Sequence, residues 1–189
     1  MILEGIVTTL NEDDSVNISP MGPKVDETMS RFVLRPYQTS TTYKNLKRTG
    51  DGVLHVTDDV ELLARAAVNR LAATPQLAKA CEVRGQVLVD TCRWYEFRVV
   101  TLDDTNDRTA IECETVFRKR NRDFFGFNRA KHAVVEAAIM ATRTQFLPAD
   151  QILDEFQRLA VIIEKTAGES ERRAFAFLQH FVDEQLTGS

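Results

Sequence analysis

The sequence predicts an α+β fold, in which an antiparallel β-barrel of about six strands with short inserted helices precedes a C-terminal helical subdomain. Two observations lead to this prediction. In the first two thirds of the chain, short segments rich in Val, Ile and Thr alternate with polar turns, as in antiparallel hairpins. In the last third, apolar residues recur at helical spacing.

The composition is that of a globular protein, with 43% hydrophobic and 28% charged residues among 189. A formal charge of -4 argues against a dedicated nucleic-acid binder, which usually has a basic excess. No apolar run approaches the ~20 residues of a membrane span. The N-terminus shows no signal-peptide pattern, and the scattered Cys81, Cys92 and Cys113 fit reduced thiols in a core. We therefore expect a cytoplasmic protein that does not contact a membrane.

The N-terminal residues predict a β-hairpin, with strands at 3–10 and 16–19 and a polar turn at 11–15. In the second strand, Asn17 and Ser19 face away from Val16 and Ile18. Pro20-Met21-Gly22-Pro23 then breaks the ladder. This pattern suits a place where a flat ligand approaches the backbone, and it equally suits an edge strand that ends in a turn.

The stretch from Arg31 to Asp59 predicts a strand, a hydroxyl-rich turn, a short helix that ends at Gly50, and another strand. Pro36 ends the first strand after Arg35, and the helix then starts in a cluster of hydroxyl residues, Thr39, Ser40, Thr41 and Thr42. The free N–H groups and the dipole of a first helical turn favour an anion. We expect a phosphate there, with Arg35 or Lys44 as a counter-charge. An ordinary Thr-rich helix cap is the alternative.

The middle of the chain predicts two helices between two groups of strands. The first runs from Asp58 and Asp59 to about residue 71, with Asp58 and Glu61 as a capping box, and the second starts at Thr74-Pro75. Strands are expected at 85–90, 94–101 and 108–117, the last two joined by a hairpin turn.

Three helices are expected after the barrel, at 128–143 with Asn128 as the cap, at 150–166, and after a cap at Ser170. The sequence thus predicts a barrel domain at residues 1–125 and a helical C-terminal subdomain at 126–189.

Catalytic signals are absent from the sequence. It shows no Ser-His-Asp, Cys-His or metal-ligand pattern, and we interpret His55, His132 and His180 as structural. A basic run from Arg118 to Arg122 precedes several Phe residues. This run suits single-stranded nucleic acid, or a solvated loop whose Phe residues anchor the helical region. The negative net charge favours the loop.

Three motifs together resemble an uncharacterised prokaryotic family within the FMN-binding split β-barrel, or flavin reductase-like, superfamily. These are Leu-Glu-Gly-Ile-Val-Thr-Thr from Leu3, Pro-Met-Gly-Pro from Pro20, and Gly-Phe-Asn-Arg-Ala-Lys-His-Ala-Val-x-Glu-Ala from Gly126. The third is the most specific, whereas Thr42-x-x-Asn45 is shared only loosely with flavin reductase-like proteins. The resemblance covers essentially the whole chain.

The resemblance implies a six-stranded antiparallel split β-barrel that forms a homodimer, with FMN near the subunit interface. Carried over to this chain, it implies that the FMN phosphate is held by Arg35, Thr39, Ser40, Thr41 and Thr42. The isoalloxazine ring would be lined by Asn17, Ser19, Pro20 and Met21. Asn128, Arg129 and Lys131 are a further candidate for phosphate or the partner subunit, although a helix start also explains them.

The expected function is that of an FMN-binding flavoprotein, an oxidoreductase whose substrate, electron donor and catalytic residues the sequence leaves open. A non-catalytic flavin carrier or sensor is the alternative, and a single-stranded nucleic-acid module is a third. No metal is expected.

Overall fold

The computed structural model describes residues 1–187, which form two compact units. The barrel unit comprises residues 1–57 and 75–124, and the helical unit comprises residues 58–74 and those from 125 onward. The helix after Asp59, which the sequence analysis placed inside the barrel domain, clusters with the C-terminal helices. The division at residues 125 and 126 stays a prediction, and the last two residues of the predicted subdomain, 188 and 189, lie outside the described residues.

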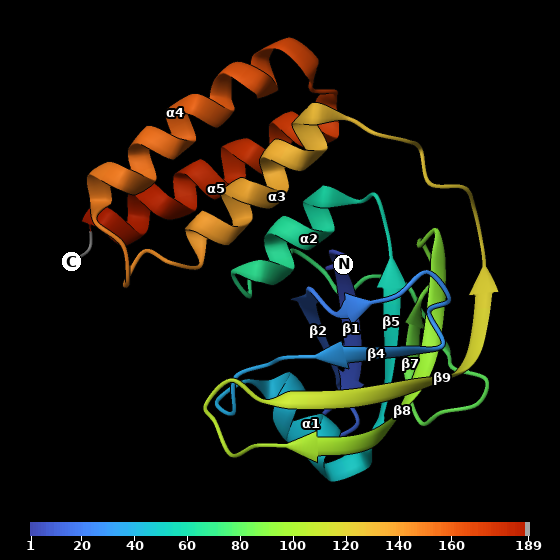
Figure 1. The fold of residues 1–189 in the computed structure, drawn as a ribbon. Coiled ribbons are helices and arrows are strands. Elements are labelled where there is room, and N and C mark those ends of the chain that lie inside the picture. The colour runs from blue at the N-terminus through green and yellow to red at the C-terminus, as the bar shows by residue number, and fades with distance from the viewer. Residues whose placement is uncertain (188–189) are drawn as a thin grey trace. The chain divides into compact units, whose positions relative to one another are not determined.

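The barrel unit is built on one curled antiparallel sheet, whose strand order is β2-β1-β5-β8-β9-β4-β3 (Figure 1). Within residues 1–187 this sheet has seven strands, not the six expected, because a two-residue strand is too short for any periodicity to reveal. The seven are β1 (Gly5–Leu10), β2 (Val16–Met21), β3 (Lys24–Val25), β4 (Arg31–Leu34), β5 (Asp51–Val56), β8 (Arg93–Asp103) and β9 (Ala110–Arg120). A separate hairpin pairs β6 (Leu77–Lys79) with β7 (Gln86–Leu88).

Several local predictions are wrong. The segment after Pro75 forms β6 and not a helix. Strand β2 continues through Pro20, which pairs with Ile6. Proline is tolerated there because β2 lies at the edge of the sheet. The first part of the basic run belongs to strand β9 and not to a loop, and Cys81 is exposed, whereas Cys92 and Cys113 are buried.

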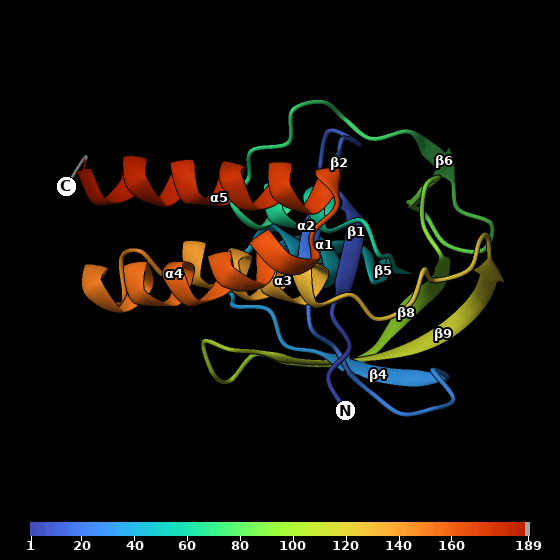
Figure 2. The ribbon, with the colours of Figure 1, turned by 90° about the horizontal axis from the view of Figure 1, so that it is seen from above.

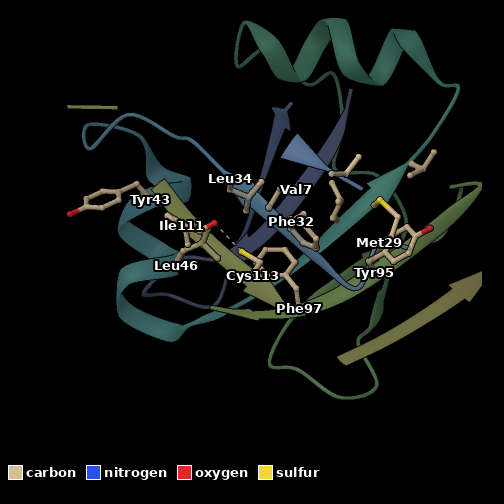
Figure 3. Packing of buried hydrophobic residues seen from close by; sticks show 13 residues of the cluster. Val7, Met29, Phe32, Leu34, Tyr43, Leu46, Tyr95, Phe97, Ile111 and Cys113 are labelled. Carbon is tan, nitrogen blue, oxygen red and sulfur yellow. Dashed lines mark hydrogen bonds between the residues drawn. The ribbon is translucent and has the colours of Figure 1, made fainter. Parts of the chain in front are cut away.

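The barrel core is an apolar cluster contributed by most of the strands and by helix α1 (Thr41–Thr49) (Figure 3). Phe32 and Phe97 meet edge to face at its centre, with ring centroids 5.2 Å apart. Gly52 lies against Phe97, since a Cβ there would come 2.5 Å from the Phe97 ring. Tyr43 and Leu46 bury one side of α1 in the same cluster, which fixes the helix on the barrel.

The helical unit contains α2 (Val60–Ala67), α3 (Arg129–Ala141), α4 (Ala149–Thr166) and α5 (Glu169–Thr187) (Figure 2). Helix α3 buries small residues, among them Ala130, Ala133 and Ala137, so neighbouring helices approach it closely. Asn128 caps α3 as predicted. Two other predicted caps are wrong: Asp59, and not Asp58, caps α2, and α5 begins before Ser170.

Candidate functional site

The start of α1 carries the chemistry expected of an anion site. Ser40 is the N-cap, and its Oγ accepts a hydrogen bond from the Tyr43 N–H at 3.2 Å. Lys44 N–H donates to the Ser40 carbonyl, 3.2 Å away. The N–H groups of Thr41 and Thr42 have no acceptor within residues 1–187. Two backbone donors at the positive end of the helix dipole are therefore left for a ligand.

Two cations flank this turn. Arg35 directly follows β4, and Lys44 lies one turn into α1. Both side chains are exposed, and neither forms an ion pair with a carboxylate of the described chain. Lys47 differs, because its Nζ lies 2.8 Å from Asp104 Oδ2 and 3.0 Å from the Tyr43 hydroxyl, and these bonds raise the pKa of the lysine. Arg35 and Lys44 thus lie near the beginning of the helix without a described carboxylate partner, whereas Arg48, in the last turn, donates to the Leu10 carbonyl.

The hydroxyls of the turn fall into two groups. Thr39 and Thr41 are exposed, and their side chains have no hydrogen-bond partner in the part of the chain that the structure describes. Thr42 is buried, and its Oγ1 accepts from Asn17 Nδ2 at 3.1 Å. Thr41 is therefore exposed without a described side-chain partner, whereas Thr42 connects the helix to strand β2.

A polar network surrounds Thr42. Asn17 Nδ2 also donates to Thr9 Oγ1 at 3.2 Å, and Asn45 Nδ2 donates to the same oxygen at 3.0 Å and to Asn11 Oδ1 at 2.8 Å. The sequence analysis missed Thr9 and Asn11. The loose Thr42-x-x-Asn45 pattern was the one available signal for Asn45, because the partners of these residues come from distant parts of the chain.

The residues expected near a flavin ring lie on β2. Asn17 and Ser19 share one face of this strand, next to α1 through the bond to Thr42. Ser19, Pro20 and Met21 are partly exposed. Among the described residues β2 pairs only with β1, so its outer edge presents backbone groups to the surroundings.

Asn128 and Lys131 lie in the helical unit, and both make bonds inside it. Asn128 Oδ1 accepts from the Lys131 N–H at 3.0 Å, and its Nδ2 donates to the Thr166 carbonyl. Lys131 Nζ lies 2.8 Å from Glu171 Oε1 and 2.7 Å from the Asp58 carbonyl oxygen. Burial raises the pKa of Glu171, but the hydrogen bond and charge of Lys131 outweigh it and the net shift is downward. These contacts account for both side chains without a ligand.

Two further searches of residues 1–187 give negative results. No group of three or more His, Cys, Asp or Glu side chains is placed to hold a metal ion. No helix in this range has both the length and the apolar character needed to cross a bilayer.

Comparison with protein families gives two matches that together span most of the chain. A model described as the N-terminal domain of a protein of unknown function, DUF447, matches residues 3–122, and a second model of DUF447 matches residues 128–180. A search of curated proteins finds no match.

Solved structures share the fold. An FMN-bound protein of the DUF447 family from Methanosarcina mazei is 22% identical, with a TM-score of 0.82 over 95% of this chain and 94% of that one. The 2-nitrobenzoate 2-nitroreductase of Pseudomonas fluorescens is 16% identical, with a TM-score of 0.52 over 62% of this chain and 64% of that one. The styrene monooxygenase flavin reductase of Pseudomonas putida is 10% identical, with a TM-score of 0.52 over 63% and 79%. The fold is therefore that of the flavin reductase-like split barrels.

Proposed function

The chain belongs to the DUF447 family, and from that premise we propose that it is an FMN-binding flavoprotein that acts as an oxidoreductase. The proposal rests on the start of α1. Two N–H groups without an acceptor among the described residues, the exposed Thr39 and Thr41 hydroxyls and two cations lie close together in the sequence there. The FMN-bound relative from Methanosarcina mazei, similar over nearly the whole chain, supports FMN as the ligand.

The turn fits a phosphate dianion. The N–H groups of Thr41 and Thr42 and the hydroxyls of Thr39, Ser40 and Thr41 would donate to its oxygens, with Arg35 as the counter-charge. Charge-assisted bonds of this kind contribute roughly 1.5–3 kcal/mol each. A few of them, together with burial of a flat ring, support micromolar binding, which corresponds to about 8 kcal/mol.

The ring would lie along β2, because Asn17 ties this strand to the same turn. Ser19, Pro20 and Met21 would line it through backbone groups as well as side chains. Bound FMN supplies hydride or single-electron chemistry, and the protein contributes position and electrostatics. Asn128 and Lys131 are secondary candidates, since their bonds are already made within the helical unit.

We further propose a homodimer with FMN near the subunit interface. The edge strand β2 would form one wall of the ring site, and the partner subunit would supply the other. A cytoplasmic location also stays a prediction.

The proposal is tested by titrating the purified protein with FMN and following flavin fluorescence. We expect saturable quenching, and Arg35→Gln should weaken binding about tenfold or more, because a charged bond is lost. Arg31→Gln is the matched control, since Arg31 begins β4, the strand that Arg35 directly follows, and pairs with Glu114. Unchanged flavin fluorescence at saturating protein would refute FMN binding.

A second experiment distinguishes an oxidoreductase from a non-catalytic flavin carrier or sensor. NADH or NADPH is added anaerobically to the FMN-loaded protein, and the yellow absorbance is followed. Rapid bleaching, at a rate that saturates as the NADH or NADPH concentration rises, supports an oxidoreductase. A flavin that stays oxidised with both donors favours the non-catalytic carrier or sensor.

A further inference from the structure

A second cationic surface lies far from the α1 turn, at the other end of the long hairpin formed by β8 and β9. A shallow hollow of about 370 Å³ occurs there, and its lining residues are Arg93, Trp94, Tyr95, Arg118, Lys119 and Arg120. Tyr43 of α1 bonds Asp104, just beyond the opposite end of β8. About ten residues of strand, or roughly 30 Å, therefore separate the hollow from the α1 turn. We call this hollow the basic groove.

The basic groove concentrates like charges that carboxylates of the described residues compensate only in part. Arg93 and Arg120 lie directly opposite each other in the β8–β9 ladder, an arrangement that is destabilising when nothing neutralises it. Arg120 pairs with Asp123, but Arg93 is exposed and forms no ion pair with a carboxylate among residues 1–187. Lys119 Nζ lies 5.5 Å from the centre of the Trp94 ring, also without a described carboxylate, and this pair projects to the opposite face of the ladder from Arg93 and Arg120. None of the lining residues of the groove is acidic.

Protection of a sheet edge explains only part of this pattern. Beyond Glu114, β9 has lost its β4 neighbour in the described chain, and charged residues on such an edge discourage association with other strands. That argument covers Arg118, Lys119 and Arg120. It does not cover Arg93, which lies on an inner strand paired with Val56 of β5 on one side and with β9 on the other.

We propose that the basic groove binds a small ligand that carries two or more phosphate groups. Its volume falls in the range of about 300–1,000 Å³ that is usual for small-ligand sites. Guanidinium groups bind phosphate oxygens in pairs, and a bridging phosphate would remove the repulsion between Arg93 and Arg120. Stacking of nucleic-acid bases on Trp94 and Tyr95 is disfavoured, because these rings are only 9% and 6% exposed. Phe124, which borders the adjoining hollow, is 49% exposed, so an oligonucleotide is included in the test below.

The groove contains its own reporter, since Trp94 is the single tryptophan of the chain. The experiment titrates the FMN-loaded protein with inorganic pyrophosphate at low ionic strength and follows tryptophan emission. The FMN already fills the α1 turn, so the signal arises from the groove. We expect a saturable change, because the ligand binds beside Arg93, the neighbour of Trp94 in β8, and a loss of affinity as salt is added.

Two variants test the assignment. Arg93→Gln should raise the midpoint about tenfold, as expected for loss of one charged bond. Arg93→Gln combined with Arg120→Gln should abolish saturation. Lys24→Gln, an exposed cation on β3, is the control and should leave the midpoint unchanged. Far-UV circular dichroism confirms that each variant is folded.

Three results would overturn the proposal. The first is no emission change at millimolar pyrophosphate. The second is a change that survives in the double variant. The third is a ligand preference that differs from the one proposed. Affinity for citrate equal to that for pyrophosphate would indicate a general anion site, and much tighter binding of a single-stranded oligonucleotide would indicate a nucleic-acid site. Loss of FMN binding would show separately as loss of flavin absorbance, so failure of the flavin proposal remains distinguishable.

Discussion

At the scale of single residues, His55 connects three strands of the barrel unit. Its side chain is fully buried, Nδ1 lies 3.1 Å from the Ile6 carbonyl, and Nε2 accepts from the Leu88 N–H at 3.1 Å. This pattern requires a neutral ring that donates from Nδ1 and accepts at Nε2. Burial lowers the pKa of His55 to about 4, although the bond to Ile6 opposes the shift.

This pKa predicts how stability depends on pH. The unfolded chain binds a proton at His55 below about pH 6.5, whereas the folded chain does so only near pH 4, so the free energy of unfolding falls as the pH drops between these values. From pH 7 to pH 5 the loss from this residue is about 2 kcal/mol. Urea unfolding followed by Trp94 emission measures it. The same pH change should cost His55→Gln about 2 kcal/mol less, and equal losses in both proteins would contradict the prediction.

Single residues also show what local sequence can predict. Gly50 and Asn128 end and cap their helices as expected, and the cap of α1, Ser40, lies within the expected hydroxyl cluster, because a cap depends on the residue itself and its immediate neighbours. The hydrogen-bond partners of His55 and Glu96 could not be predicted, although His55 was interpreted as structural. Glu96 is buried and accepts from the N–H groups of Cys81 and Glu82, which pairing of the strands alone brings within reach.

At the scale of elements, two neighbouring threonines in the first turn of α1 have different environments. Thr41 is exposed without a described side-chain partner, whereas Thr42 is buried and accepts from Asn17. A joint replacement of both would therefore mix loss of a ligand contact with loss of a structural bond. Separate, nearly isosteric changes to valine distinguish the two.

Thr41→Val and Thr42→Val should affect different quantities. We expect Thr41→Val to weaken FMN binding about tenfold while leaving the free energy of unfolding unchanged, because only a hydroxyl directed to the ligand is lost. Thr42→Val should lower the free energy of unfolding by about 1 kcal/mol, because Asn17 loses an acceptor, with little effect on FMN affinity. Fluorescence titration and urea unfolding measure the two quantities. The assignment of Thr41 to the phosphate would be wrong if its variant bound FMN normally.

Elements differ in how well the sequence predicts them. Helices α3 and α4 and the long strands β8 and β9 carry many periodic positions, so their existence was predictable. Strands β3 and β6 have two and three residues, too few for a period, and Pro75 preceding β6 resembled a helix start. The candidate site was predictable as a hydroxyl-rich helix start, but its connection to β2 required the tertiary structure.

At the scale of the whole molecule, each of the two units has its own apolar core and its own polar interactions. The barrel unit depends on the Phe32–Phe97 cluster and on the polar network at α1. The helical unit depends on small buried residues of α3, on contact between Phe156 and Phe175, and on the Lys131–Glu171 pair. The sequence indicated an α+β chain because the two halves have different hydrophobic periods, and the strand order followed only from pairing between distant segments.

A homodimer with FMN near its interface predicts that cofactor binding and association are linked. If each flavin contacts both subunits, FMN binds the dimer more tightly than the monomer, and it must strengthen the dimer by a reciprocal factor. Sedimentation equilibrium with and without FMN should therefore show a dissociation constant at least about tenfold lower for the FMN-loaded protein. Arg35→Gln should shift this constant less at the same FMN concentration, because less of the protein is loaded. A protein that stays monomeric when saturated with FMN would exclude the shared site, while leaving the phosphate turn of α1 intact.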